Sequence, residues 1–429
     1  MKLFKKAGLP LLFVAILGGI VGYTLRDTLE DIGQIAQAQA IESEQSSEAK
    51  PQIASTAKLP DPNIYFPGTE ALAPDEMRIV ACGTGMPTAR EAQAATCWLV
   101  ELGNGDKFIF DAGTGSASRM ASLHIPYDYL NKIFLSHLHT DHFGDFPAYF
   151  IGGWVAGRQH PLHVYGPSGD RTETGTKYAI DRMREAMTWD IEGRAGRLPA
   201  EGGKVIVHEF DFKKENQVVY EENGVTIRSW PANHTIDGPV SYSLMWNGLK
   251  FVFGGDTYPN KWFVKYATDA DLVIHECFIV VPDMVDKFGF SVSTALEVGT
   301  QIHTAPPAFG KVMSIVKPRM AVAYHFFNDP DTAPSILEGV RSTYDGPLTL
   351  AEDYMVWNVT KDDIRVRKVA YNEDMWPPPA PQAPPPVDRS ITKYVSDWIT
   401  AENLDVKDIV QNIYDRANKK YGTNEKPNQ

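Results

Sequence analysis

Three histidines and an aspartate lie within six consecutive positions of the chain. They fall in the segment Ser-His-Leu-His-Thr-Asp-His-Phe-Gly-Asp, and the candidate ligands are His137, His139, Asp141 and His142. Imidazole nitrogens and a carboxylate this close together match borderline divalent cations, zinc above all. The segment follows an apolar run and precedes a helical pattern, so a loop at a strand end can turn the four side chains toward one point. Positions 137 and 139 can share one ion while positions 141 and 142 reach a second.

Further polar side chains stand where later apolar strands end. These strand-end residues are His234, Asp256, the adjacent pair His275 and Glu276, and His325. Taken alone, each of them could be either a metal ligand or a polar residue whose hydrogen bonds are satisfied at the end of a strand. A site for two metal ions needs more ligands than the first cluster supplies. Taken with that cluster, these residues could complete such a site.

The elements that must position these residues are short strands mixed with helices. Asn223-Gly224 and Asn247-Gly248 each separate two alternating apolar runs, which predicts tight hairpins because both turn positions need a positive φ. Helical patterns are interleaved with these strands, for example over residues 178–187 and 308–316. Hairpins with interspersed helices predict an α/β protein with two mixed sheets and helices on the outside.

The segment His137-Leu-His-Thr-Asp-His142 resembles the signature of the metallo-β-lactamase-fold hydrolases. The resemblance covers about residues 77–369, and it implies an αββα four-layer sandwich with a two-metal site at one edge. The order of the candidate ligands also resembles the full ligand series of that superfamily. By position, the first ion would be held by His137, His139 and His234, and the second by Asp141, His142 and His325, with Asp256 as the bridge.

Within that superfamily the chain is similar to the ribonuclease Z and arylsulfatase-like branch. This similarity rests on Gly83-Thr-Gly-Met-Pro87, Gly254-Gly-Asp-Thr257, His275-Glu276 and the later His303. Over nearly the whole chain it also resembles the metallo-hydrolase family named for guanitoxin biosynthesis. The resemblance implies that Glu276 and His303 act beside the metals together with Asp141. His303 would protonate the leaving group or contact an oxyanion, and Glu276 would orient His303 or fix a ligand histidine.

The expected activity is hydrolysis of a small phosphodiester or sulfate ester through a metal-bound hydroxide. The expected cofactors are two divalent ions, Zn²⁺ first, with Mn²⁺ or Fe²⁺ as alternatives. Hydrolysis of a lactone or β-lactam, and a non-catalytic metal-binding role at a surface, are the competing interpretations. The aromatic and basic residues expected around a substrate pocket are Trp154, Arg158, Trp189, Phe326 and Phe327.

The charge balance predicts that nucleic acid is not a partner. Lys and Arg total 41 against 54 for Asp and Glu, a formal net charge of −13. Over residues 170–204, where ribonuclease Z-like enzymes carry a basic arm, the basic and acidic residues are equal in number. Proteins that neutralise many phosphates are usually basic. The expected partner is therefore a small-molecule ester.

The amino-terminal segment has the pattern of an export signal. Three lysines precede an apolar run over residues 7–25, which is also long enough to remain as a membrane anchor. The protein is therefore expected to be periplasmic, or anchored and facing the exterior. The expected organisation is residues 1–40 for this segment, a linker over 41–76, the hydrolase domain over 77–369, a Pro-rich spacer over 370–388 and a helical extension over 389–429. The extension would dock on the domain or form a homodimer.

Overall fold

The computed structural model describes residues 61–427. The predicted export or anchor segment over residues 7–25, and the predicted linker up to residue 60, lie outside the described residues. Between residues 61 and 427, no helix is both long enough and apolar enough to cross a membrane.

The first of two sheets has nine strands, in the order β1-β16-β15-β2-β3-β4-β5-β6-β7. Strands β4, β5, β6 and β7 run parallel to one another, whereas β15, β2, β3 and β4 are joined as antiparallel neighbours. In that order the strands are Ile64–Tyr65, Ile364–Val369, Met355–Val359, Met77–Gly83, Cys97–Leu102, Lys107–Phe110, Lys132–Phe134, Leu162–Pro167 and Val205–Phe210.

The second sheet has seven strands, in the order β14-β13-β12-β11-β10-β9-β8. Strands β11 to β14 are parallel, and β8 to β11 are joined as antiparallel neighbours. The turns at Asn223 and Asn247 connect β8 to β9 and β10 to β11, and both asparagines have the positive φ that the sequence predicted. The strands are Leu348–Leu350, Met320–Tyr324, Leu272–Glu276, Leu249–Phe253, Val240–Trp246, Val225–Pro231 and Gln217–Glu222.

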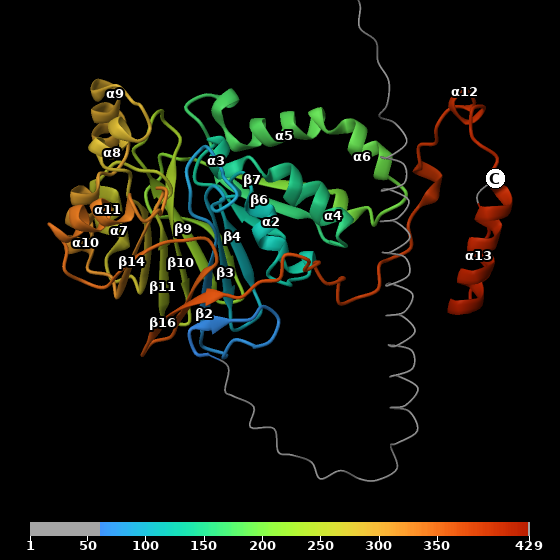
Figure 1. Cartoon of the computed structure of the whole chain (residues 1–429), viewed down its shortest axis with the longest axis horizontal. Helices are drawn as coiled ribbons and strands as arrows, with labels where there is room; N and C mark the ends of the chain where they lie inside the picture. The colour runs from blue at the N-terminus through green and yellow to red at the C-terminus, as the bar shows by residue number, and fades with distance from the viewer. Residues whose placement is uncertain (1–60, 428–429) are drawn as a thin grey trace, which may run out of the picture. The chain divides into compact units, whose positions relative to one another are not determined.

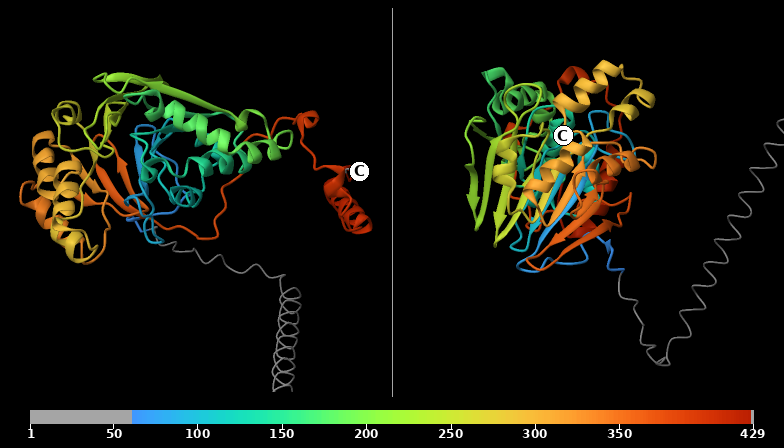
Figure 2. Two further views of the ribbon diagram at one scale, coloured as in Figure 1. Left: turned by 90° about the horizontal axis from the view of Figure 1, so that it is seen from above. Right: turned by 90° about the vertical axis from the view of Figure 1, so that its left-hand side faces the viewer.

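Helices cover the outer face of each sheet (Figures 1 and 2). Those beside the first sheet are α2 (Ser116–Ala121), α3 (Thr140–Phe143), α4 (Gly153–Val155), α5 (Thr176–Ala186) and α6 (Thr188–Arg194). Those beside the second sheet are α7 (Lys261–Ala267), α8 (Val281–Asp286), α9 (Val292–Glu297), α10 (Pro306–Val316) and α11 (Ala333–Arg341). The remaining helices, α12 (Asp397–Thr400) and α13 (Lys407–Tyr421), belong to the carboxyl-terminal extension.

Three apolar clusters fill the spaces between these layers. The central cluster lies between the two sheets and includes Trp98, Phe110 and Phe251. The two outer clusters lie between each sheet and its helices, as Met120 of α2 and Phe263 of α7 illustrate. Because each sheet buries both faces, its central strands are apolar at nearly every position. The predicted four-layer αββα arrangement is therefore observed.

The packed structure extends beyond the predicted domain on both sides. Strand β1 pairs with β16 and buries Tyr65, although the linker was expected to continue to residue 76. In the Pro-rich spacer, the Gln382 carbonyl accepts a hydrogen bond of 2.8 Å from the Gln159 side chain. The carboxyl-terminal extension is helical in part, as the sequence predicted, and its large apolar side chains, such as Trp398 and Ile409, are exposed.

Candidate metal centre

The candidate ligands lie at the carboxyl ends of strands that run in one direction. His137 and His139 follow β5, and His234 follows β9. Asp256 follows β11, and His325 follows β13. The ends of parallel strands meet at one edge of a sheet, where side chains from distant parts of the sequence can converge. All seven residues predicted from the sequence as ligands are brought together there, in two groups of four that share Asp256.

The first group consists of three imidazoles and a carboxylate. The Nδ1 atom of His139 lies 3.1 Å from Nε2 of His137 and 3.2 Å from Nε2 of His234. Each residue of the group offers a ligand atom within 4.8 Å of the others, with Asp256 as the fourth member. Three nitrogens and one oxygen converging in this way form a donor set that suits zinc and related cations.

The second group consists of two imidazoles and two carboxylates. His325 Nε2 lies 3.1 Å from Asp141 Oδ2 and 3.1 Å from Asp256 Oδ2, and His142 Nε2 lies 3.2 Å from Asp256 Oδ1. All four side chains of this group are buried. Because Asp256 presents one oxygen to each of these histidines and also belongs to the first group, it lies where a bridging ligand is needed.

Glycine allows Asp256 to approach the histidine loop. Gly255 has a φ of +59°, and a Cβ atom there would lie 2.6 Å from the Cβ of Ser136. A larger residue would therefore push the Asp256 loop away from the loop that carries His137. Glycine at position 255 therefore lets the two sheets contribute ligands to one site.

The ligand atoms themselves fit the presence of cations. Among the described residues, Asp141 Oδ1, His142 Nε2 and both carboxylate oxygens of Asp256 are buried and lack a hydrogen-bond partner. Burying a carboxylate without a partner lowers the stability of the fold by roughly several kcal/mol unless a cation compensates for the lost hydration. Divalent cations bound by these two groups would supply that compensation.

Asp111, which the sequence analysis did not single out, orients ligands of both groups. Its Oδ2 atom accepts hydrogen bonds from His142 Nδ1 at 2.6 Å and from Ser136 Oγ at 2.7 Å, and Ser136 Oγ lies 3.0 Å from His137 Nδ1. With its proton on Nδ1, each imidazole keeps the lone pair of Nε2 for a metal. Asp111 is fully buried and has a φ of +59°. The signal in the sequence was an aspartate that ends the apolar strand β4.

Burial and neighbouring carboxylates shift the pKa values of these histidines in opposite directions. Burial lowers the pKa of His137, and it lowers that of His234 to about 4. Burial alone would also lower the pKa of His142, but the carboxylates of Asp256, Asp141 and Asp111 together raise it well above its ordinary value. The shifts of His137 and His234 favour the neutral imidazole that a metal ligand needs, whereas the carboxylates around His142 favour a positive charge beside them.

Glu276 and His303 form a pair at the border of the site. Glu276 Oε2 lies 2.7 Å from His303 Nδ1, and Glu276 Oε1 accepts a hydrogen bond of 2.6 Å from the backbone N–H of Thr257, next to Asp256. The His303 ring stacks on Phe278 at a centroid distance of 4.1 Å. Burial lowers the pKa of His303, but the carboxylates of Glu276, Asp256 and Asp141 raise it to about 8 overall.

His275, the neighbour of Glu276, does not join the site. Side chains alternate between the two faces of a strand, so when Glu276 faces the ligands, His275 faces the outer helices. It is fully buried and packs against Phe263 and Phe309. Its Nδ1 lies 2.7 Å from the Glu276 carbonyl oxygen, and its Nε2 has no hydrogen-bond partner among the described residues. Of the two interpretations that the sequence left open for His275, the residue that is not a ligand is therefore the one observed.

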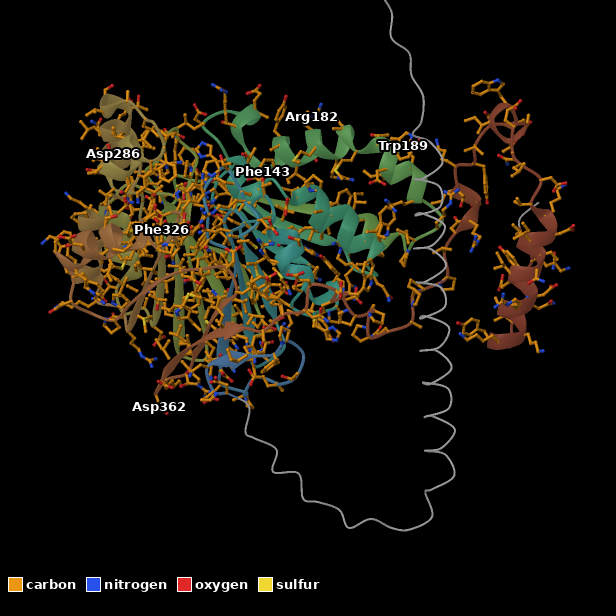
Figure 3. All side chains as sticks on the ribbon, viewed as in Figure 1. Phe143, Arg182, Trp189, Asp286, Phe326 and Asp362 are labelled. Carbon is orange, nitrogen blue, oxygen red and sulfur yellow. The ribbon has the colours of Figure 1, made fainter. Side chains whose placement is uncertain are left out.

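A cavity of about 310 Å³ opens beside the first group. We call it the apolar cavity, because most of its wall is made by Leu138, Phe143, Pro167, Ala179, Ile236 and Pro239. Its floor includes His137 and His139. Figure 3 shows Phe143 beneath the helix α5 that carries Arg182. Leu138, Phe143 and Ile236 stand within two positions of a candidate ligand in the sequence. The available signal was therefore the presence of apolar residues beside the ligands.

None of the five expected pocket residues lines the apolar cavity. Trp154 is buried and donates a hydrogen bond of 2.7 Å to the Pro199 carbonyl. Arg158 is fully buried and donates to the carbonyls of Tyr149, Phe150 and Gly202, so it completes the end of a helical segment. Trp189 lies on α6 and is 86% exposed (Figure 3).

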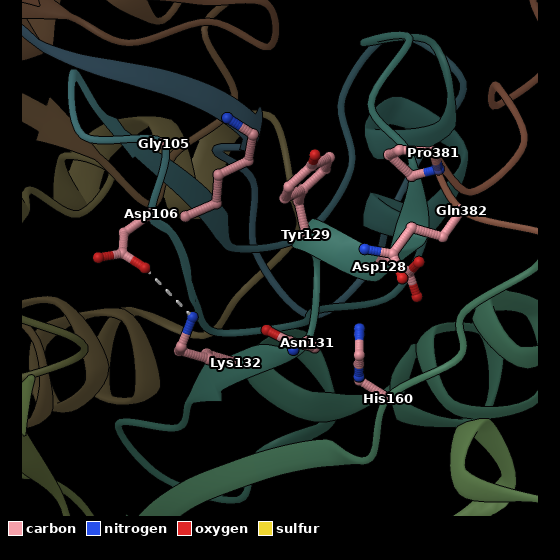
Figure 4. Close-up of a pocket in the computed structure, with 10 residues that line it drawn as sticks. Gly105, Asp106, Asp128, Tyr129, Asn131, Lys132, His160, Pro381 and Gln382 are labelled. Atoms are coloured by element: carbon pink, nitrogen blue, oxygen red, sulfur yellow. Dashed lines mark ion pairs between the residues drawn. The ribbon is translucent and has the colours of Figure 1, made fainter. Parts of the chain in front are cut away.

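A second cavity, of about 240 Å³, lies between the domain and the Pro-rich spacer (Figure 4). Its lining includes Lys107, Lys132, His160 and Gln382, and none of the candidate ligands. Lys107 Nζ lies 2.8 Å from Glu101 Oε2, and Lys132 Nζ lies 3.7 Å from Asp106 Oδ1. Because both lysines have acidic partners, this cavity offers no free positive charge to a ligand.

The fold and the clustered histidines and aspartates define a metallo-hydrolase. The family model of the metallo-beta-lactamase superfamily matches residues 90–261. A ribonuclease Z from a Mycobacterium species (strain KMS) is 31% identical over 205 residues, which are 47% of this chain and 67% of that protein. The chain belongs to the metallo-beta-lactamase superfamily.

Two other comparisons agree, one with the similarity to ribonuclease Z and the other with the fold. The ribonuclease Z of Mycobacterium marinum is 28% identical over 218 residues, 49% of this chain and 74% of that protein. The crystal structure of the metallo-beta-lactamase fold protein YhfI from Bacillus subtilis covers 66% of this chain and 100% of its own, with a TM-score of 0.50 and 17% identity. The predicted superfamily and fold are therefore confirmed, together with the similarity to ribonuclease Z.

The prediction that nucleic acid is excluded as a partner is wrong. It is overturned by these relatives, which are named ribonucleases. The prediction relied on the net charge of the whole chain and on the charge balance of residues 170–204. A net charge sums over the entire surface, and single regions of that surface can have a different potential. An acidic total therefore does not exclude a nucleic-acid partner.

Proposed function

We propose that the protein is a metal-dependent phosphodiesterase that uses two divalent cations, with zinc as the preferred metal. The observation that carries this proposal is the pair of four-residue ligand groups that share the buried, otherwise unpartnered Asp256. The similarity to ribonuclease Z supports a phosphodiester as the substrate class. RNA and smaller diesters both belong to that class.

His137, His139 and His234 would hold one cation, and Asp141, His142 and His325 the other, with Asp256 shared. Such a pair of cations, when bound, lowers the pKa of water and offsets the charge of phosphoryl oxygens. Asp111 keeps the Nε2 atoms of His142 and His137 free for coordination through the hydrogen bonds described above. Asp141 serves as a ligand and places a negative charge next to His325.

We assign His303 as the group that protonates the leaving oxygen. Its ring is held by the stack on Phe278 and by the 2.7 Å contact to Glu276, so that Nδ1 faces the carboxylate and Nε2 is left to meet a substrate. Glu276 is a positioning residue in this account, because both of its oxygens already contact the protein. A proton delivered to the leaving oxygen matters most when that oxygen belongs to a weakly acidic alcohol.

A panel assay tests this function. Zinc-loaded protein is given bis(p-nitrophenyl) phosphate, an RNA with a 3′ extension, p-nitrophenyl sulfate, a lactone and a β-lactam. We expect chelator-sensitive hydrolysis of phosphodiesters that is lost in Asp256→Ala. The matched control is Asp362→Ala, an exposed aspartate in the β15–β16 turn, which should keep the rate. Equal phosphodiester rates in both variants, or hydrolysis of the β-lactam or lactone alone, would overturn the proposal.

A further inference from the structure

The apolar cavity adjoins the ligands of the first group without any intervening element. His137 and His139 form part of its lining, and Leu138 stands between them in the sequence. The other walls come from the end of β6, from α3, from α5 and from the loop over residues 235–239, which directly follows His234. A molecule whose reacting phosphate lies at the metal centre can therefore place one of its substituents in this cavity.

The two threonine hydroxyls at the cavity already have polar neighbours. Thr174 Oγ1 donates a hydrogen bond of 2.9 Å to Asp170, and Thr235 Oγ1 lies 3.5 Å from His139 Nε2. What remains for a ligand is mostly the apolar surface of side chains such as Phe143 and Ile236. A polar substituent would lose its hydrogen bonds to water there without replacement.

The charges at the cavity disfavour a second anion. Its lining includes the carboxylates of Glu173 and Asp237, and, among the described residues, no Lys or Arg. A substituent that carries its own negative charge would therefore be repelled at this side of the site. The volume of about 310 Å³ is at the lower end of the range of roughly 300–1,000 Å³ for ligand sites, which suits a single ring system.

We propose that the apolar cavity binds an uncharged apolar ester group, such as an aromatic ring system, of a phosphodiester whose phosphate lies at the metal centre. This inference rests on the proposed function and names the substrate class within it. Ile236 and Ala179 determine the specificity: Ile236 is 62% exposed, as an apolar contact for a ligand would be in the free protein. Ala179 on α5 is a small residue of the lining, so a larger side chain there would take up space in the cavity.

The test measures binding of methylphosphonate esters by calorimetry, and phosphorus NMR of the same samples confirms that the remaining ester bond stays intact. Three monoanionic or dianionic esters of methylphosphonic acid are compared on zinc-loaded protein: the 1-naphthylmethyl ester, the methyl ester and the 3-carboxypropyl ester. We expect the naphthylmethyl ester to bind about tenfold or more tightly than the methyl ester, and the carboxypropyl ester to bind most weakly. Equal affinities for the naphthylmethyl and methyl esters would overturn the inference.

Two matched pairs of variants locate the effect. Ala179→Phe should fill the cavity and remove the preference for the naphthylmethyl ester, whereas Ala186→Phe, an exposed alanine on the same helix, should keep it. Ile236→Ser should weaken the preference, whereas Ile315→Ser, which is 49% exposed on α10, should not. Melting temperatures report whether each variant folds. If Ala179→Phe does not fold, the comparison of Ile236→Ser with Ile315→Ser still tests the proposal. Equal losses within both pairs would contradict the assignment.

Turnover of bis(p-nitrophenyl) phosphate by the same preparations separates this inference from the proposed function. If zinc-loaded wild-type protein hydrolyses no phosphodiester but binds the naphthylmethyl ester selectively, the proposed function fails and the apolar cavity retains its ligand class. If turnover is present and binding is not selective, the cavity assignment fails alone.

Discussion

Two carboxylate–histidine pairs lie within the same site and have nearly the same hydrogen-bond length. The Asp111–His142 pair measures 2.6 Å, and the Glu276–His303 pair measures 2.7 Å. Both residues of the first pair are fully buried, and the other nitrogen of His142 faces the carboxylates of Asp141 and Asp256. The side chain of His303 keeps 12% of its surface exposed. Under the proposed function, the same chemical pair therefore prepares a metal ligand in one place and a proton donor in the other.

Under the proposed function, the surroundings of the second nitrogen decide the role. Where that nitrogen faces carboxylates in the protein interior, as in His142, a cation is the natural partner. The partly exposed His303 would instead meet a substrate oxygen. A third pair, His163 and His208 on β6 and β7, has a nitrogen–nitrogen distance of 2.9 Å and, within residues 61–427, no carboxylate in hydrogen-bond contact. Its pKa values move downward instead of upward.

The largest effect is expected from removing the proton donor. In His303→Ala, the rate should fall by about 10²–10⁴-fold for the least acidic leaving groups and change little for p-nitrophenolate, which leaves without protonation. The measurement is kcat for aryl phosphodiesters of graded leaving-group acidity. His160→Ala, at an exposed histidine, is the control. A loss of equal size across the series would show that His303 acts in some other way.

A smaller effect is expected from weakening the Asp111–His142 pair. Asp111→Asn keeps the shape of the side chain, and asparagine tolerates the left-handed backbone conformation at this position. The loss of the charged acceptor should reduce metal affinity about 10–100-fold, measured by competition with a chromophoric chelator. Asp362→Asn should leave the affinity unchanged. Unaltered affinity in Asp111→Asn would remove its role in orienting the ligands.

The smallest effect concerns the histidine pair without a carboxylate contact. Burial is the largest cause that lowers the pKa of His163 and of His208 below the ordinary value of 6.5. The unfolded chain therefore binds more protons than the folded chain just below pH 6.5, and stability falls as the pH drops through that window. His208→Gln should make this fall shallower in denaturant titrations at a series of pH values. If stability falls with pH as steeply in His208→Gln as in wild type and in the control His160→Gln, the lowered pKa values would be contradicted.

Part of the site could be read from local sequence. His137, His139, Asp141 and His142 stand within one loop, so their convergence depends only on that loop and on the strand before it. Asn-Gly hairpins were predictable for the same reason, because a two-residue turn is decided by its own residues. The strand-end ligands, such as His234 and His325, required the superfamily resemblance, since their partners lie far away in the sequence.

The remainder depends on contacts that no local pattern encodes. Asp111 supports His142 across 31 positions. Asp353 accepts hydrogen bonds from the backbone N–H groups of Thr84 and Ala94, which are 269 and 259 positions away. The aromatic residues Trp154 and Trp189 were expected at a pocket on residue type alone. One is buried by the helices around it, and the other is exposed on α6, because burial is decided by tertiary packing.

We propose that this chain holds two cations through seven side chains, with Asp256 shared between the two groups. The most direct measurement is metal content by mass spectrometry after zinc loading and desalting of wild type, Asp256→Ala and His303→Ala. Two zinc ions per chain are expected in wild type and in His303→Ala, and fewer than two in Asp256→Ala. One zinc ion or none in wild type, or two in Asp256→Ala, would contradict the account.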